Sequence, residues 1–330
     1  MSAPDVPAAH YRAVAKALAG GRAIPFLGAG VNLCGRDPTL AWHPGQSEYL
    51  PSGAELARYL AEAFDYPPSE PNDLLRVSQY VAVMQGSGPL YTELHTLFDA
   101  DYPPTPLHRF LAQLPAALRE KGYPPRHQLI VTTNYDDLME RAFREAGQPF
   151  DLVAYVAEGE NRGKFVHWPF EGDPRLIAKP DEYREVSTEQ RPVIIKIHGE
   201  VDRHGAVVRD SFVITEDHYI DYLTRTDLAS LVPVNLAAKL KQSHFLFLGY
   251  GMRDWNLRVI LHRIAGEQTL TYKSWAIQLD PDALEQRIWT RRDVEILNVD
   301  LGQYVAQLDE HVRALPPPPP RAEGREHHRD

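Results

Sequence analysis

The sequence predicts an α/β fold in which helices cover both faces of a doubly wound parallel sheet. Apolar, β-branched runs of strand length recur along the chain, and each is followed by a segment of helix length. Strands without polar alternation are buried on both faces, and strands that alternate with helices pair in parallel. Glycines or polar residues end most of the runs, as in Rossmann-like sheets, which bind ligands beyond the carboxyl ends of their strands.

The first elements of the fold are predicted near the N-terminus. An amphipathic helix is expected over 8–19, where a pair of glycines ends it. The apolar strand in "RAIPFLGAGVN" then runs directly into a glycine turn. The next segment, "SGAELARYLAEAF", predicts a helix that starts with a capping box formed by Ser52 and Glu55.

The rest of the chain divides into an insertion, further strand and helix pairs, and a tail. The pattern over 70–125 is helical and broken by prolines, which predicts a helical insertion on the sheet. Strands are then expected in "HQLIVTT", "PVIIKIHG", "SHFLFLGYG", "SWAIQLD" and "VEILNVD". The polar and aromatic segment 157–191 is expected to pass over the face that holds the site. An α/β domain over 1–69 and 126–315 and a disordered, proline-rich tail over 316–330 complete the predicted organisation.

Composition and charge exclude several classes of protein. The chain has 330 residues and a net charge of −10, which opposes direct binding to a nucleic-acid backbone. The single cysteine, Cys34, excludes a disulfide framework and a four-cysteine zinc module, and it is compatible with a reducing cytoplasm. The sequence shows neither a signal-peptide pattern nor a run of 18 apolar residues. We therefore expect a cytoplasmic protein that contacts neither membrane nor nucleic acid.

The candidate site residues follow the predicted strands. Because the carboxyl ends of parallel strands share one edge of a sheet, we expect these residues to lie close together. In chain order, the strand tips read Gly28-Ala29-Gly30-Val31-Asn32, Thr132-Thr133-Asn134-Tyr135-Asp136, His198-Gly199 and Gly249-Tyr250-Gly251.

Each tip allows a functional and a purely structural interpretation. The glycines of "FLGAGVN" can let backbone amides cradle a pyrophosphate, or they can form only a tight turn. Asn134 can hold a water or a ribose hydroxyl and Asp136 can accept from a carboxamide, or they can make a local turn and cap a helix. His198 can take a proton from a ribose hydroxyl, or it can be a structural histidine. Arg253 and Asp254 can surround a nucleotide, or Asp254 can be an N-cap.

Taken in order, these motifs resemble the SIR2-like, sirtuin-fold proteins of bacterial anti-phage defence. "GAGVN" resembles the family's G-A-G-x-S loop, with Asn32 in place of the serine, and "TTNYD" matches its T-x-N-x-D element. "KIHG" matches the catalytic His-Gly pair, and "GYGMRDWNLR" resembles a G-Y-S-x-x-D-x-N-x-R stretch of the SIR2-like branch. The resemblance extends from about 22 to 300. It implies the sirtuin fold with a helical insertion, and it departs from the deacylases in lacking their zinc module of four cysteines.

The resemblance also implies roles for individual residues. Asn134 and His198 would be catalytic, with His198 as the general base towards the ribose or as the group that positions a water. The residues that would bind NAD are Gly28, Ala29, Gly30, Asn32, Thr133, Asp136, Gly249, Tyr250, Arg253 and Asp254. No metal site is expected.

The function that the resemblance implies is hydrolysis of NAD+ to nicotinamide and ADP-ribose, as the NAD-depleting effector of a phage-defence system. Such activity is restrained until infection is sensed, which implies a homo-oligomer and an activating partner such as an ATPase, a short Argonaute-type protein or another sensor. Two alternatives remain open at this point. One is an NAD-dependent protein deacylase, and the other is a non-catalytic module that binds NAD or ADP-ribose.

Overall fold

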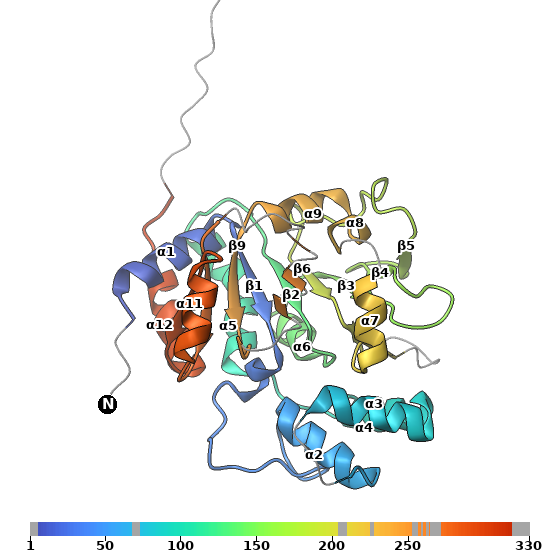
Figure 1. Cartoon of the computed structure of the whole chain (residues 1–330). Coiled ribbons are helices and arrows are strands. Elements are labelled where there is room, and N and C mark those ends of the chain that lie inside the picture. The colour runs from blue at the N-terminus through green and yellow to red at the C-terminus, as the bar shows by residue number, and fades with distance from the viewer. Residues whose placement is uncertain are drawn as a thin grey trace, which may run out of the picture.

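A nine-stranded sheet forms the centre of the computed structural model, which describes residues 6–67, 73–203, 210–224, 228–252, 257–258, 260–261, 264 and 272–318 (Figure 1). Its strand order is β11-β10-β9-β1-β2-β6-β3-β4-β5. All pairings from β11 to β3 are parallel, and β4 and β5 add antiparallel strands at one edge. Connections run in opposite directions from β1 and β9, so the crevice between their tips is the topological switch point.

The strands of the sheet are β1 Ala23–Leu27, β2 Leu129–Thr132, β3 Asp151–Tyr155, β4 Phe165–Trp168, β5 Arg175–Ile177, β6 Val193–Lys196, β9 His244–Leu248, β10 Ser274–Gln278 and β11 Val294–Asn298. A separate ladder pairs β7 Gly199–Glu200 with β8 Ser211–Phe212. The described helices are α1 Ala8–Ala19, α2 Gly53–Ala63, α3 Leu74–Gln85, α4 Ser87–Phe98, α5 Pro106–Glu120, α6 Leu138–Glu145, α7 Glu216–Thr224, α8 Leu228–Leu231, α9 Val234–Lys241, α11 Ala283–Thr290 and α12 Leu301–Arg313.

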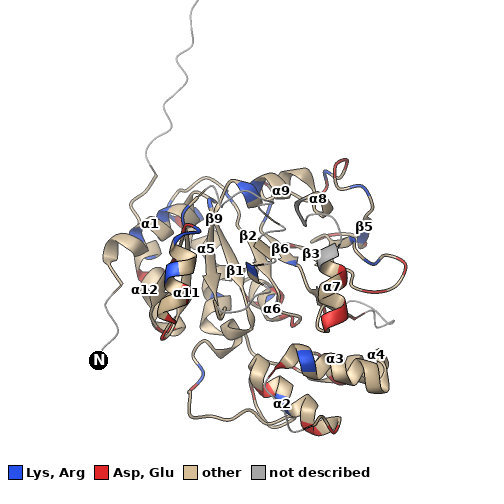
Figure 2. Ribbon diagram, viewed as in Figure 1, with Lys and Arg blue, Asp and Glu red and all other residues tan. Residues whose placement is uncertain are grey.

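The sheet separates two hydrophobic cores. Successive side chains of a strand point to opposite faces, so Ile24 and Phe26 of β1 join one core while Ala23 and Leu27 join the other. The first core lies under α7, α9 and α11, and the second lies under α1, α5, α6 and α12. Figure 2 shows the charged residues spread over the outer helices and loops and nearly absent from the central strands. These strands are therefore buried on both faces, which explains their continuous apolar sequence.

Several predicted elements are confirmed, and one expectation is wrong. The helix over 8–19 is α1, and Ser52 and Glu55 form the predicted capping box of α2. The segment 157–191 does not pass over the site face, because it supplies β4 and β5 to the sheet edge. In β4, buried and half-buried residues alternate, a pattern typical of a strand with one solvated face.

The helical unit, defined here as α2, α3 and α4, lies beyond the carboxyl ends of the central strands (Figure 1). These helices pack together around a third core, which also receives Leu138, Phe212 and Ile214 from the α/β part. The helix α5 instead packs against α6 and α12 on the sheet. We therefore propose that the insertion comprises Gly53–Phe98, in place of the expected 70–125.

Two further expectations concern the membrane and the tail. Among the described helices, none is long and apolar enough to cross a membrane. Of the predicted tail, residues 319–330 lie outside the described part of the chain.

Candidate active site

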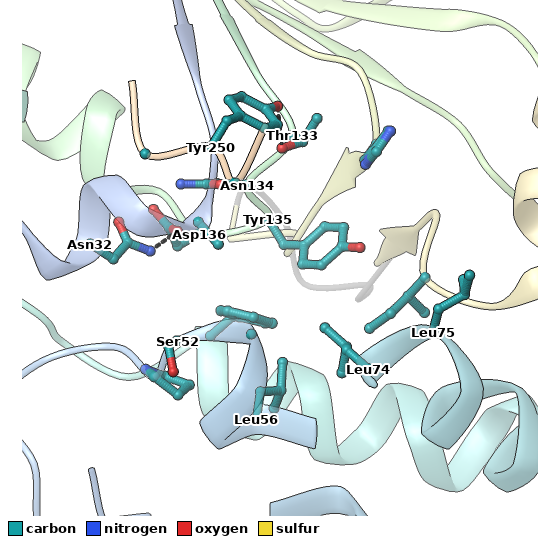
Figure 3. A pocket seen from close by; sticks show the side chains of 18 of the residues that line it. Asn32, Ser52, Leu56, Leu74, Leu75, Thr133, Asn134, Tyr135, Asp136 and Tyr250 are labelled. Atoms are coloured by element: carbon teal, nitrogen blue, oxygen red, sulfur yellow. Dashed lines mark hydrogen bonds between the residues drawn. The ribbon is translucent and has the colours of Figure 1, made fainter. Parts of the chain in front are cut away.

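A cavity of about 560 Å³ lies between the strand tips and the helical unit (Figure 3). Its size falls within the roughly 300–1,000 Å³ typical of small-molecule sites, and its position at the switch point is the usual one for ligands of open parallel sheets. The predicted site residues that line it are Ala29, Asn32, Thr133, Asn134, Asp136, His198, Gly249 and Tyr250. The structure therefore brings together strand tips that are far apart in sequence.

The glycine turn after β1 is bonded to the turn after β9. The amide N–H groups of Gly28 and Gly30 donate to the carbonyl oxygens of Leu248 and Gly249, each over 2.9 Å. A Cβ atom on either Gly28 or Gly30 would lie 2.8 Å from the Gly249 carbonyl oxygen. The tight-turn interpretation thus accounts for both glycines, and within the motif Ala29 and Asn32 are the residues that face the cavity.

Gly249 should tolerate no side chain. Its φ of +72° disfavours L-residues, and an added Cβ would lie 2.3 Å from the Val31 nitrogen. We expect Gly249→Ala to lower the free energy of unfolding by about 2–3 kcal/mol, measured by urea denaturation. Gly251 lines the same cavity and has open space around a Cβ, so Gly251→Ala is the matched control, expected to change stability by less than about 0.5 kcal/mol. Equal losses in the two variants would contradict this account.

Asn134 and Thr133 connect the tip of β2 to the turns after β1 and β9. Asn134 Nδ2 donates to the carbonyl oxygen of Gly28 over 3.3 Å, and the backbone N–H of Asn134 donates to Thr132 Oγ1 over 3.0 Å. The Thr133 hydroxyl is hydrogen-bonded to the Tyr250 hydroxyl at 2.7 Å. These bonds fix the Asn134 side chain at the cavity wall.

Asp136 is buried beside the cavity, and both of its carboxylate oxygens have partners. Oδ1 accepts from the backbone N–H of Leu138 over 3.1 Å at the start of α6, and Oδ2 accepts from Asn32 Nδ2 over 2.9 Å. Burial raises the pKa of Asp136, while the Asn32 hydrogen bond and the Lys196 charge act against that rise. Asp136 therefore accepts from the first residue of α6, whose N-cap is Asp137, and it also orients Asn32.

His198 enters the cavity from the tip of β6. Its ring is 3% exposed and packs edge-on against Tyr219 and Tyr222, with ring centroids 5.3 and 5.6 Å away. Nδ1 lies 3.4 Å from the Tyr219 hydroxyl. The following residue, Gly199, has a φ of +84°, and a Cβ there would lie 2.0 Å from the Ser211 carbonyl oxygen. Only glycine fits this position, which explains the His-Gly pair, and the resulting turn holds the imidazole at the cavity.

A buried group of charges lies next to the strand tips that carry Asn134 and His198. Lys196, 1% exposed, places Nζ 2.5 Å from Glu140 Oε1 and 3.7 Å from Glu200 Oε2, and it donates to the Asp136 carbonyl oxygen over 2.7 Å. Burial acts to lower the pKa of Lys196, but the carboxylates of Glu140 and Glu200 outweigh it, so this pKa lies above its usual range. Lys196 thereby ties the loop that carries Asn134 to the loop that carries His198. The lysine at the end of an otherwise apolar strand was the available signal for this cluster.

Glu200 should make stability depend on pH. Burial raises the pKa of Glu200 from 4.5 to about 7, and Lys196 offsets this only in part. A carboxyl group whose pKa is higher in the folded than in the unfolded state stabilises the folded state. This contribution is complete below pH 4.5 and is lost as the pH rises through about 7. Relative to Glu200→Gln, which mimics the protonated group, the wild-type protein should lose about 2–3 kcal/mol between about pH 5 and about pH 8. Urea unfolding across this range measures the difference, and a constant difference would refute the assignment.

The helical unit supplies cavity residues that the motifs did not indicate. The lining residues outside the predicted set are Pro51, Ser52, Gly53, Leu56, Asp73, Leu74, Leu75, Phe98, Tyr135, Ile214, Tyr219, Gly251 and Ile260. Two sequence-predicted residues, Arg253 and Asp254, lie outside the described part of the chain. Among the described residues, no three His, Cys, Asp or Glu side chains are grouped to hold a metal ion.

Comparisons with known proteins give relatives of two kinds. The chain is 24% identical to "Defense-associated sirtuin 2" of Bacillus subtilis, over 80% of this chain and 21% of that protein. It is 28% identical to "NAD(+) hydrolase ThsA" of Acinetobacter baumannii, over 64% of this chain and 35% of that protein, and 26% identical to the ThsA protein of Enterococcus faecium, over 76% and 41%. The chain thus spans about a fifth to two fifths of the length of these relatives.

A structural and a family comparison complete these findings. A solved Sir2 enzyme structure aligns with 92% of this chain and 97% of its own at 14% identity, with a TM-score of 0.41, which is too low to support an inference. The family model of the SIR2-like domain matches residues 128–297, slightly more than half of the chain. This match includes the tips of β2, β6 and β9, and with them Asn134 and His198. The chain belongs to the SIR2-like domain family.

Proposed function

We propose that the protein is an NAD+ hydrolase that cleaves the bond between nicotinamide and ribose, giving nicotinamide and ADP-ribose. The observation that carries this proposal is the convergence of Asn134 and His198 on one cavity at the switch point. Relatives that carry the name NAD(+) hydrolase ThsA support it. NAD is proposed as the substrate, with no metal ion in the reaction.

Cleavage of this bond develops positive charge on the ribose, so a catalyst must orient the ribose, hold the leaving group and place a water. Asn134 is suited to orient the ribose or the water, because Gly28 holds its Nδ2 and directs Oδ1 away from that contact. His198 would accept the proton from the ribose hydroxyl or the attacking water, as a neutral imidazole can near neutral pH. The rest of the nucleotide would be bordered by Thr133, Tyr250 and the turn at Ala29. The other residues that remain predicted to bind NAD are Gly28, Gly30, Gly249, Arg253 and Asp254.

Product analysis tests the proposed reaction. The purified protein is incubated with NAD alone and, separately, with NAD and an acetylated lysine peptide, and all products are identified by mass spectrometry. We expect equal amounts of nicotinamide and ADP-ribose in both mixtures and an unchanged peptide. If the peptide is deacetylated and NAD is consumed only when the peptide is present, the protein is a deacylase and not an NAD+ hydrolase.

We further propose that the activity is restrained in the resting cell, because an enzyme that destroys NAD unchecked would deplete the cell that makes it. An activating partner protein, or a change in a homo-oligomer, would release this restraint. The relative named Defense-associated sirtuin 2 supports a role in defence, which we propose is directed against phage. The proposed place of action is the cytoplasm, where NAD is abundant. Size-exclusion chromatography with light scattering, with and without NAD, measures the molar mass in solution and so tests whether the protein forms a homo-oligomer.

A further inference from the structure

We propose that Arg36 and Glu55 are positioning residues, whose ion pair fixes the spacing between two walls of the cavity. One wall is formed by the glycine turn after β1, and the other by the first turn of α2. Neither Arg36 nor Glu55 is among the cavity residues, so the pair acts on the ligand only through the walls that it joins. The proposal rests on NAD being the ligand of the cavity.

The ion pair is bidentate and largely buried. Arg36 Nη1 lies 2.9 Å from Glu55 Oε2 and Nη2 lies 2.6 Å from Oε1, and the two side chains are 9% and 14% exposed. The guanidinium also lies over the ring of Tyr49, with Cζ 4.2 Å from the ring centroid. A bidentate pair fixes the relative orientation of its two groups as well as their distance. Water and salt screen a buried pair less than a surface pair.

Glu55 connects three points of the chain. Besides the bonds from Arg36, its Oε2 accepts from the Ser52 N–H over 2.8 Å, and its Oε1 accepts from the Trp42 N–H over 3.1 Å. The bonds from Arg36 lower the pKa of Glu55 to about 2, although burial acts in the opposite direction, so the carboxylate is charged at neutral pH. The segment between the two walls is therefore tied to one carboxylate at residues 36, 42 and 52.

Both ends of this segment lie at the cavity. Asn32, in the turn that precedes Arg36, lines one wall, and Ser52 and Gly53 line the other (Figure 3). The backbone N–H of Arg36 donates to the carbonyl oxygen of Leu33 over 3.0 Å, which continues the turn up to the ion pair. Loss of the pair would therefore release the first turn of α2 from the turn after β1.

The consequence is a loss of affinity with little change in the chemical step. Without the pair, only a fraction of the free protein would hold Ser52 and Gly53 in place, and the apparent affinity falls with that fraction. Hydrogen bonds to charged groups are strong enough for us to expect about 10-fold weaker binding of NAD. Other contacts hold Asn134 and His198, so kcat should change by less than about twofold.

Dissociation constants for NAD test the proposal. They are measured by calorimetry in a His198→Ala background, which should leave NAD intact, for Arg36→Met, Glu55→Gln and the double variant. Glutamine can replace glutamate in a capping box, so both single variants remove the ion pair and keep the start of α2. We expect each to bind NAD about 10-fold more weakly, and the double variant to bind it no more weakly than either, because all three lose the same interaction. In proteins that retain His198, KM should rise while kcat stays nearly constant.

The matched control is Arg191→Met. Arg191 also pairs with a buried carboxylate, that of Asp151 at 3.0 Å, and its Cζ lies 5.7 Å from the centroid of the Phe170 ring. Asp151 begins β3, at the end of the strands opposite the cavity, and Arg191 is not among the cavity residues. We expect this variant to lose stability and to retain its affinity for NAD.

The outcomes separate this proposal from the function on which it rests. Unchanged dissociation constants in folded Arg36→Met and Glu55→Gln overturn the role of the ion pair and leave NAD as the ligand. An equal loss of affinity in Arg191→Met also overturns it, because general destabilisation then explains the effect. If no folded protein binds NAD, the proposed substrate is wrong, and the role of the pair falls with it. Thermal unfolding of each variant establishes that the compared proteins are folded.

Discussion

Replacement of His198 by alanine is expected to lower the rate of NAD cleavage about 100- to 10,000-fold, the usual contribution of a general base. His198 lies at the cavity, and Tyr219 and Tyr222 hold its ring edge-on. The alanine variant retains the cavity and loses the group that we propose accepts the proton. Initial rates of nicotinamide release at saturating NAD measure the effect.

The control for this prediction is a second buried histidine. His167 on β4 is 1% exposed, is hydrogen-bonded to the Tyr183 hydroxyl at 2.7 Å and is not among the cavity residues. We expect His167→Ala to lower stability while the folded protein retains its turnover. If the two variants lose activity to the same extent, the loss reflects general damage to the fold, and His198 is not the base.

Replacement of Lys196 by methionine is expected to destabilise the protein by about 3–5 kcal/mol. The methionine fills a similar volume but leaves the buried Glu140 carboxylate without its ammonium partner, which lies 2.5 Å away in the native protein. The loops that Lys196 connects, at Asp136 and at Glu200, also lose their common contact. Urea denaturation at neutral pH measures the change.

A double variant separates charge from volume in this cluster. Lys196→Met combined with Glu140→Leu removes both charges, and well-packed apolar replacements of a buried ion pair are often nearly neutral. We therefore expect the double variant to be more stable than Lys196→Met alone. Equal or greater instability in the double variant would show that the ion pair is not the source of the loss.

The positions of most central strands along the chain could be predicted because they depend on local pattern. Continuous apolar runs in β1, β2, β6 and β9, each followed by a polar or glycine-rich tip, indicate buried parallel strands. The strand β3 was missed, since the polar residue Asp151 at its start interrupts the apolar run. The strands β4 and β5 were read as a surface loop, because edge strands with one solvated face lack the continuous apolar signal.

The candidate site was predicted less completely than the sheet. The rule that parallel strand tips share an edge was sufficient to bring Asn32, Asn134 and His198 to one cavity. Which residues of α2 and α3 line the cavity depends on how the helical unit packs against the strand tips. The sequence pattern does not specify that packing. Likewise, the bond between Asn32 and Asp136 joins residues 104 positions apart, and the sequence pattern around either residue does not indicate it.

Hydrolysis of NAD in water enriched in oxygen-18 tests the central claim most directly. The wild-type protein and Asn134→Ala are incubated with NAD, and the ADP-ribose is analysed by mass spectrometry. We expect the wild-type protein to release nicotinamide and ADP-ribose that carries one labelled oxygen on the ribose, and Asn134→Ala to release almost none. Labelled product that forms equally well in Asn134→Ala would show that cleavage does not need Asn134, and a wild-type protein that leaves the NAD unchanged would contradict hydrolysis.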